Sequence, residues 1–241
     1  MKIALASKKF INNDIDFNLN VILKSMDEVK QKNVEILCFG ESFLQGFDAL
    51  SWDNYESDLA IALEKDSDVI KQISTKSKVL SLCVMFGYIE KEFGKIYSSY
   101  LVIDKGEIIH NYRRISKGWK EYSKTNDFYC EGKEVPLFKL EGHDCAIALC
   151  GDLYSFPERF RVEEEILIWP VYLNFSMDEW NNVEKAEYER IAGNTCRHVL
   201  WINSLSDNPD AYGGCYYFKE GKIEQALELG MDGIMIAEVS V

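Results

Sequence analysis

The chain has 241 residues, of which 47% are hydrophobic and 28% charged, and its formal net charge is −13 with a pI near 4.8. This length is sufficient for one large domain with a sizeable core. No Pro/Gly/Ser-rich stretch or charge block suggests a linker, so we expect a single domain over residues 1–241. The acidic balance argues against a nucleic-acid or anionic-membrane partner, because both require a basic surface.

The N-terminal stretch MKIALASKKF lacks the long apolar region of a signal peptide. No run approaches the roughly 18 to 20 apolar residues of a membrane span. The seven cysteines form no CxxC pair and have no regular spacing, which favours neither a disulfide framework nor a thiolate metal site. We therefore expect a soluble cytoplasmic protein without a metal.

Apolar periodicity predicts an alternation of strands and helices. Strand-like runs cover residues 3–6, 34–39, 79–88, 97–103, 107–112, 135–140, 145–149, 166–169, 200–204, 214–218 and 233–239. Turns at 105–106 and 220–221 join neighbouring strands as hairpins. Apolar residues at helical spacing predict a helix from about residue 15 to 29 behind an Asn13/Asp14 cap, and further helices over 59–73 and 180–191. This alternation indicates a mixed α/β layer protein.

Polar side chains follow three of these runs where each run ends. Glu41 follows VEILCFG, a basic cluster and then Glu121 follow GEIIHNY, and Cys150 follows DCAIAL. In open α/β sheets ligands bind beyond the strand ends, where loops converge on a rigid frame. We expect the three ends to form one site.

Cys150 is the candidate nucleophile of this site. It stands where an apolar strand turns into Gly151, and a glycine lets a substrate carbonyl approach the backbone N–H. A cysteine nucleophile also needs a base. None of the three histidines stands at a matching strand end: His110, His143 and His198. A carboxylate closed into an apolar pocket has its pKa raised toward the operating pH, so Glu41 is the predicted base.

The motifs around these residues resemble those of the nitrilase (carbon–nitrogen hydrolase) superfamily. KIALAS resembles the opening strand, ILCFGESFLQGF the first-glutamate motif, and YRRISKGWKE the motif that normally carries the catalytic lysine. The stretch from NDFYCEG to LCGDLYSFPE is similar to the path from an F-x-x-G element to the nucleophile in C-x-D followed by F-P-E. NTCRHVLWINS resembles the late helix-to-strand segment. These motifs occur in the family's order over nearly the whole chain, which makes the resemblance specific.

The resemblance implies an αββα sandwich with mixed sheets and helices on the outer faces. It also implies hydrolysis of non-peptide C–N bonds without metal or organic cofactor, and by analogy a homodimer. Glu41 then corresponds to the general base, Cys150 to the nucleophile, and Glu121 to the second glutamate, which shapes the pocket and orients the substrate. The Gly151 N–H and a nearby cation would stabilise the oxyanion before a thioester forms.

The sequence departs from the family at the expected lysine. Arg114 stands at the matching position, and its planar fork has a different donor geometry from an ammonium. Two readings are open at this stage: Arg114 supplies the positive charge, or Lys117 or Lys120 just downstream reaches the pocket. Arg114 as an ion-pair partner of Glu121 is a third interpretation of that residue.

Two further residues are candidates for substrate contacts. The segment between the nucleophile and F-P-E is one residue longer than is usual in the family, which makes Tyr154 the first specificity candidate. Asn174 follows the next strand and is predicted to line the same cavity.

Three functions fit this pattern. The first is an enzyme whose substrate is a small-molecule amide. Hydrolysis of a small linear amide, such as an ω-amide or an N-carbamoyl amine, agrees with the retention of Glu41 and Cys150. A catalytically silent ligand-binding protein of the same fold agrees with the presence of Arg114. An acyl transferase would pass the thioester to an amine instead of water, and the sequence does not separate it from a hydrolase.

Overall fold

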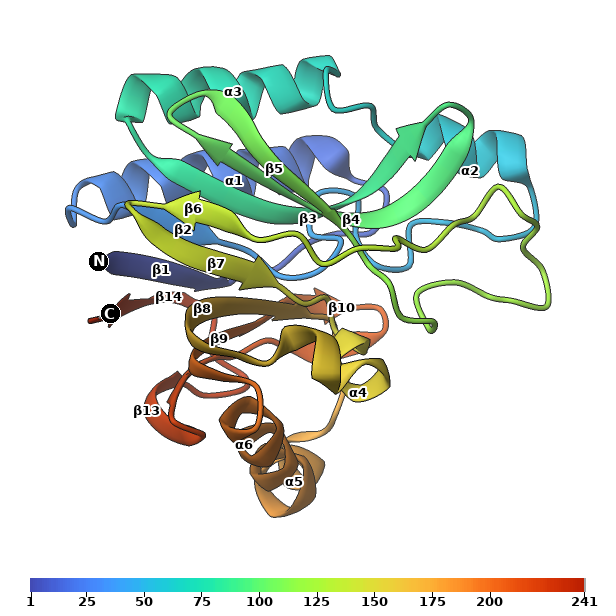
Figure 1. Cartoon of the computed structure of the whole chain (residues 1–241). Coiled ribbons are helices and arrows are strands. Elements are labelled where there is room, and N and C mark those ends of the chain that lie inside the picture. Colours follow the sequence, from blue (N-terminus) through green and yellow to red (C-terminus); the bar gives the residue numbers. More distant parts are fainter. Residues whose placement is uncertain (241) are drawn as a thin grey trace.

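Figure 1 shows the chain as a computed structural model, in which two six-stranded sheets pack face to face and helices cover the outer faces. The structure describes residues 1–240, with side chains for all of these except residues 162–165. The predicted α/β sandwich with mixed sheets is confirmed.

The first sheet has the strand order β14-β1-β2-β3-β4-β5. Its strands are β1 (Lys2–Ser7), β2 (Ile36–Cys38), β3 (Cys83–Glu92), β4 (Lys95–Asp104), β5 (Glu107–Arg113) and β14 (Gly233–Glu238). The central strands β1, β2 and β3 run parallel, and β3, β4 and β5 form an antiparallel meander. The C-terminal strand β14 pairs with β1, so both ends of the chain share one sheet.

The second sheet has the order β13-β12-β9-β8-β7-β6. Its strands are β6 (Phe138–Leu140), β7 (His143–Ile147), β8 (Val162–Val171), β9 (Cys196–Asn203), β12 (Cys215–Lys219) and β13 (Lys222–Leu227), and a small separate pair is formed by β10 (Leu205–Asp207) and β11 (Asp210–Tyr212). Strands β7, β8 and β9 run parallel. Their carboxyl ends therefore share one edge of the sandwich.

Helices α1 (Ile15–Lys30) and α3 (Asp68–Leu80) cover the outer face of the first sheet (Figure 1). Asp14 caps α1 as predicted, because its side chain accepts a hydrogen bond from the Phe17 backbone N–H at 2.9 Å. The apolar stripe of α1 is buried against the sheet. A short helix α2 (Tyr55–Ile61) precedes α3, so the predicted helix over 59–73 is in fact two helices.

One continuous helical stretch covers the second sheet. It comprises α5 (Met177–Glu179), a π-helical turn (Trp180–Glu184) and α6 (Lys185–Gly193). A capping box at Ser176 and Glu179 starts it. Between β7 and β8, the short helix α4 (Asp152–Ser155) and a 3₁₀ turn (Pro157–Phe160) follow Cys150.

The prediction of a strand from residue 79 was wrong at its start. Val79 belongs to the last turn of α3 and is 77% exposed, and β3 begins only at Cys83. Ser81 ends α3 in the left-handed conformation. In the sequence, the apolar residues at the end of α3 run directly into those at the start of β3, so the boundary between helix and strand is hidden. The hairpins at 105–106 and 220–221 are present, and a third one at Phe93-Gly94 joins β3 to β4.

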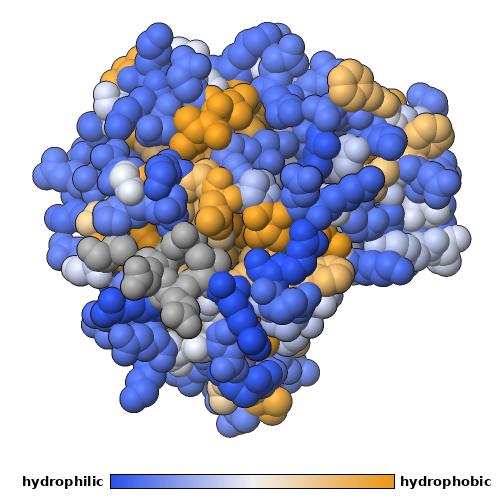
Figure 2. Space-filling view, viewed as in Figure 1, coloured by the Kyte–Doolittle hydropathy of each residue, from blue (hydrophilic) through white to orange (hydrophobic). Residues whose placement is uncertain are grey.

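The main core fills the space between the two sheets, where Tyr100 is buried, and continues between the second sheet and its covering helix, where Trp169 stacks on Tyr188 and Trp201 on Trp180. A second core lies under α1 and α3. Figure 2 shows one face of the molecule, on which hydrophilic residues surround a few apolar patches. Among the residues that the structure describes, no helix is long and apolar enough to cross a membrane.

Candidate active site

The three strand ends singled out in the sequence meet at one edge of the sandwich. Glu41 follows β2 of the first sheet, Arg114 follows β5 of the same sheet, and Cys150 follows β7 of the second sheet. Arg114 Nη1 lies 2.9 Å from Glu41 Oε1. A methyl group placed on Gly151 would lie 3.0 Å from Arg114 Nη2, so the guanidinium reaches the nucleophile turn.

Glu41 is fully buried and has one oxygen that is occupied and one that is free. Its Oε1 accepts hydrogen bonds from Arg114 Nη1 at 2.9 Å and from Ser98 Oγ at 3.2 Å. Its Oε2 is buried and has no hydrogen-bond partner within the described part of the chain. Burial raises the pKa of Glu41 above its ordinary 4.5, and Arg114 partly offsets this rise. The free oxygen is therefore an acceptor of raised basicity in a dry site.

Cys150 occupies a strained turn that its backbone hydrogen bonds hold in place. Its φ of 44° lies in the left-handed region, which a residue with a side chain rarely adopts. The Cys150 N–H donates to the Pro170 carbonyl at 2.9 Å, and Trp169 Nε1 donates to the Cys150 carbonyl at 2.9 Å. The Tyr172 backbone N–H donates to the sulfur. Residues at the end of strand β8 and just after it therefore fix the position of the Cys150 backbone and thiol.

Burial and the charge of Glu41 raise the pKa of Cys150 to about 12, and Arg114 only partly offsets the rise. At pH 7 roughly one molecule in 10⁵ then carries the thiolate. The resting cysteine is consequently a neutral thiol, and it needs a base within reach to become a nucleophile.

The guanidinium of Arg114 donates hydrogen bonds to three acceptors. Nε donates to Ser116 Oγ at 2.9 Å, Nη1 to Glu41, and Nη2 to the Lys117 carbonyl at 3.1 Å. Burial opposes the charge, but the carboxylate of Glu41 raises the pKa of Arg114 above its already high value, so the guanidinium stays charged at every physiological pH. Of its five N–H groups, three are used, and one hydrogen on each terminal nitrogen is left for a ligand.

Asp152 ties the nucleophile turn to the Arg114 loop. The carboxylate is fully buried. It accepts four hydrogen bonds, from the Tyr112 hydroxyl at 2.6 Å and from the backbone N–H groups of Ser116 at 2.7 Å, Leu149 at 2.9 Å and Ile115 at 3.2 Å. Asp152 therefore has a structural role in this turn.

Replacing Asp152 by Asn is expected to lower the free energy of unfolding by about 2–4 kcal/mol, because an amide nitrogen cannot accept the bonds that one carboxylate oxygen accepts. Urea unfolding followed by circular dichroism measures this loss. Asp144→Asn is the matched control, since Asp144 forms an exposed ion pair with Lys139 and its replacement should cost less than about 0.5 kcal/mol. Equal losses in the two variants would contradict the assigned role of Asp152.

The two alternative lysines do not contact Glu41. Lys117 is exposed, and its Nζ lies 5.3 Å from the centre of the Tyr122 ring. Lys120 pairs with Glu131 at 3.2 Å. Arg114 is the cation that the structure places at Glu41.

The comparisons with known proteins show the family of this chain. The family described as Carbon-nitrogen hydrolase matches residues 2–187 of the chain. This protein belongs to the carbon–nitrogen hydrolase family. The resemblance seen in its motifs is thereby confirmed.

Curated relatives of this carbon–nitrogen hydrolase are distant. A glutamine-dependent NAD(+) synthetase of Acinetobacter baylyi is 23% identical over 155 residues, which are 64% of this chain and 27% of the relative. A cyanide hydratase of Penicillium rubens is 23% identical over 172 residues, 66% of this chain and 48% of the relative. The chain therefore spans about a quarter of the synthetase and about half of the hydratase.

Solved structures share the fold over the whole length. A CN-hydrolase superfamily protein from Xanthomonas campestris, with an arsenic adduct in its active site, has a TM-score of 0.82 at 14% identity and covers 100% of this chain and 90% of its own. An amidase from Nesterenkonia sp. has a TM-score of 0.75 at 14% identity, over 99% of this chain and 90% of its own. At this identity they show the common fold.

The structure does not bring Glu121 to the site of this carbon–nitrogen hydrolase, which corrects the predicted pairing with Arg114. Glu121 is exposed, and its backbone carbonyl starts a turn by accepting from the Lys124 and Thr125 N–H groups, both at 3.0 Å. Glu131 holds the loop instead, because it accepts from Trp119 Nε1 at 3.2 Å and from the Tyr122 hydroxyl. The chain turns at Gly118, with φ 99°, and directs Trp119 rather than Glu121 inward.

The three residues predicted to contact the substrate, Gly151, Tyr154 and Asn174, have different surroundings in the structure. The nearest groups to a methyl on Gly151 would belong to Arg114 and Ser116, so this glycine makes room for the guanidinium rather than for a substrate carbonyl. Tyr154 lies on α4 and is 46% exposed. Asn174 is exposed and makes no described contact with the site. Asn203 holds the segment just after β8. Its side-chain Nδ2 donates to the Leu173 carbonyl at 2.9 Å, and its Oδ1 accepts from the Leu173 N–H at 3.0 Å.

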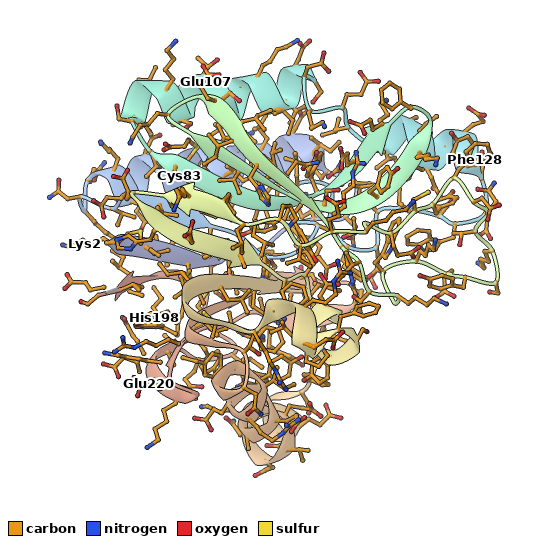
Figure 3. All side chains as sticks on the ribbon, viewed as in Figure 1. Lys2, Cys83, Glu107, Phe128, His198 and Glu220 are labelled. Carbon is orange, nitrogen blue, oxygen red and sulfur yellow. The ribbon has the colours of Figure 1, made fainter. Side chains whose placement is uncertain are left out.

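None of the three histidines touches Cys150. His198 is paired with the Tyr217 hydroxyl at 2.7 Å near the start of β9, whereas the site lies beyond the carboxyl ends of the parallel strands. Figure 3 labels His198 on the opposite side of the view from α4. Among the described residues, no group of three or more His, Cys, Asp and Glu could hold a metal ion.

Sequence reasoning missed several contributors to the site. Ser98 lies in the middle of β4, and Tyr172 acts through its backbone, so neither has a sequence signal. Tyr188 on α6 lies within electrostatic range of Cys150 and stacks on Trp169. In the sequence, the spacing of Tyr188 from Trp180 and Ile191 predicts only that Tyr188 lies on the buried face of a helix.

Proposed function

We propose that this protein hydrolyses the C–N bond of a small linear amide through a thioester on Cys150, with Glu41 as the general base. The observation that carries the proposal is the free, buried Oε2 of Glu41 beside a thiol that is neutral at physiological pH. A thiol with a pKa near 12 is inert alone, and Glu41 is the acceptor of raised basicity whose charge acts on it.

In the first step Glu41 takes the thiol proton as the sulfur attacks the amide carbonyl carbon. The C–S bond forms, and the carbonyl π electrons move to oxygen. In this proposal the Gly151 N–H and one unused N–H of Arg114 donate hydrogen bonds to the oxyanion. Because Arg114 is already held by three acceptors, it needs little rearrangement during the step.

In the second step the oxyanion collapses and the C–N bond breaks. Protonated Glu41 gives its proton to the leaving nitrogen, which departs as a neutral amine or ammonia, and the acyl group stays on sulfur. A water molecule then attacks the thioester while Glu41 accepts its proton, and the carboxylic acid and the thiol are released. Atoms and charges balance over the cycle, with water as the only co-reactant.

Ammonia release from a panel of small primary amides tests this proposal. Wild type is expected to release ammonia from at least one amide, and Cys150→Ala from none. Cys130→Ala is the control, because Cys130 is also partly exposed but its thiol donates to the Asp127 carbonyl at 3.2 Å. Turnover that survives in Cys150→Ala would overturn the nucleophile assignment, and silence of wild type with every amide would favour a binding protein.

A further inference from the structure

Ser98, in the middle of β4, contacts both charged residues that meet at the active site. The side chain is buried, with 3% of the residue exposed. Its Oγ donates to Glu41 Oε1 at 3.2 Å, and its backbone carbonyl accepts from the Arg114 N–H at 2.9 Å. Arg114 Nη1 donates to the same Oε1 at 2.9 Å. Ser98, Glu41 and Arg114 therefore form a closed ring of hydrogen bonds, in which two donors meet on one carboxylate oxygen.

Two donors on one oxygen fix the plane of the Glu41 carboxylate. A donor to a carboxylate oxygen prefers to lie near the plane of the group, so two donors at Oε1 determine that plane. The last torsion of a glutamate side chain is otherwise broad and roughly two-fold, and a single donor leaves the group able to turn about it. Ser98 thus adds a constraint that Arg114 alone does not supply. Oε2 is left as the oxygen without a donor among the described residues.

The opposite face of the same sheet carries a second Glu–Arg–Ser set, in which both carboxylate oxygens have donors. Successive residues of a strand point to opposite faces, so Ser99 and Arg113, which pair across β4 and β5, lie on the other side from Ser98 and Arg114. Ser99 Oγ donates to Glu90 Oε2 at 2.6 Å. Arg113 donates to both oxygens of Glu90, at 2.7 and 2.8 Å. The two sets use the same residue types, but only the inner one leaves an oxygen free.

This difference in donors changes what the two carboxylates can do. Burial alone would raise the pKa of Glu90, but the hydrogen bonds from Arg113 and Ser99 outweigh it, and the pKa lies below its ordinary 4.5. Burial raises the pKa of Glu41 above the same value. Glu90 is therefore a structural anion. Glu41 keeps one oxygen that can take a proton, and the ring of hydrogen bonds through Ser98 sets the direction of that oxygen.

Building on the proposed function, we infer that Ser98 is a positioning residue, which holds the Glu41 carboxylate so that Oε2 faces the thiol proton of Cys150. Ser98 acts through Glu41 and takes no part in the proton transfer itself. A proton acceptor must lie within hydrogen-bond reach of the proton that it removes, so the orientation of the carboxylate affects the rate directly. Loss of the hydroxyl should slow the chemical step and leave substrate binding unchanged.

Ser98→Ala and Ser99→Ala are matched variants, because the two serines are neighbours in β4, both are buried, and each donates to one glutamate. Ser98→Ala is expected to lower kcat by about tenfold, since it removes a hydrogen bond to a charged group. The KM should stay within about twofold of wild type, because the substrate does not contact the serine. Ser99→Ala should leave kcat per folded molecule unchanged. Ser98→Thr restores the hydroxyl and should recover most of the lost kcat.

Crystal structures of the same variants provide a readout without turnover. In Ser98→Ala the Glu41 carboxylate should leave its wild-type plane or take two orientations, and in Ser99→Ala it should keep the wild-type plane. Ser98→Cys, whose thiol is only a weak donor, should show the same change and serves if Ser98→Ala does not fold.

An unchanged Glu41 orientation in both Ser98→Ala and Ser98→Cys would overturn the inference. Equal losses of kcat in Ser98→Ala and Ser99→Ala, or a higher KM with unchanged kcat in Ser98→Ala, would overturn it as well. If wild type releases ammonia from no amide, the proposed function fails, and the orientation of Glu41 in Ser98→Ala still decides whether Ser98 positions this carboxylate.

Discussion

Glu41→Gln is expected to lower kcat by about 10²–10⁴-fold, the range that a positioned general base contributes. The thiol of Cys150 has a pKa of about 12, and the free oxygen of Glu41 is the acceptor proposed for its proton. A glutamine keeps the shape of the side chain but cannot take a proton. Steady-state kinetics with the best amide from the panel measure the loss.

The Glu41→Gln chain should still fold, which separates a chemical effect from a structural one. A Gln oxygen can accept the bonds from Arg114 and Ser98 that Glu41 Oε1 accepts. In the wild type, the raised pKa of Glu41 predicts that kcat/KM falls as the pH drops through a value above the ordinary 4.5. Full activity in a folded Glu41→Gln variant would exclude Glu41 as the base.

Arg114→Ala is the second prediction with a large effect. Removing the guanidinium leaves the Glu41 charge buried without its partner, which should cost roughly 3–5 kcal/mol of stability. It also removes the proposed oxyanion donor, for which a further loss of about 10²–10³ in kcat per folded molecule is expected. Urea unfolding and kinetics on the folded fraction measure the two effects separately.

Arg114→Lys and Arg113→Ala are the matched variants. An ammonium at position 114 can pair with Glu41 but cannot also reach Ser116 and the Lys117 carbonyl, so we expect kcat within about tenfold of wild type and reduced stability. Arg113 pairs with Glu90 and Glu92 at 2.7 Å, away from Glu41. Arg113→Ala should therefore lower stability without lowering kcat per folded molecule. Wild-type kcat in Arg114→Ala would contradict a role for the cation in the reaction.

The positions of Glu41, Arg114 and Cys150 in the fold were predictable, because each of them follows the end of a predicted strand. Apolar runs that stop at Glu41 and Cys150 place both at one edge of a layered α/β fold, and Arg114 follows a third run. The four hydrogen bonds of Asp152 join the turn after Cys150 to the Arg114 loop and keep this arrangement together.

The side-chain partners of the site were not predictable to the same degree. Glu121 and Glu131 are both acidic loop residues, and only the turn at Gly118 decides which one faces Trp119. Gly151 was interpreted as space for a substrate, but its space is taken by Arg114 from the other sheet. Such contacts depend on how the two sheets pack, and the periodicity of the sequence holds no information on that packing.

The central claim is the thioester on Cys150, and intact-mass analysis of acid-quenched turnover tests it most directly. Wild type mixed with a reactive amide should gain the mass of the acyl group, and peptide mapping should place the gain on Cys150. Cys150→Ala treated in the same way should keep its original mass. An acyl group mapped to another residue, or the same gain in Cys150→Ala, would contradict the account.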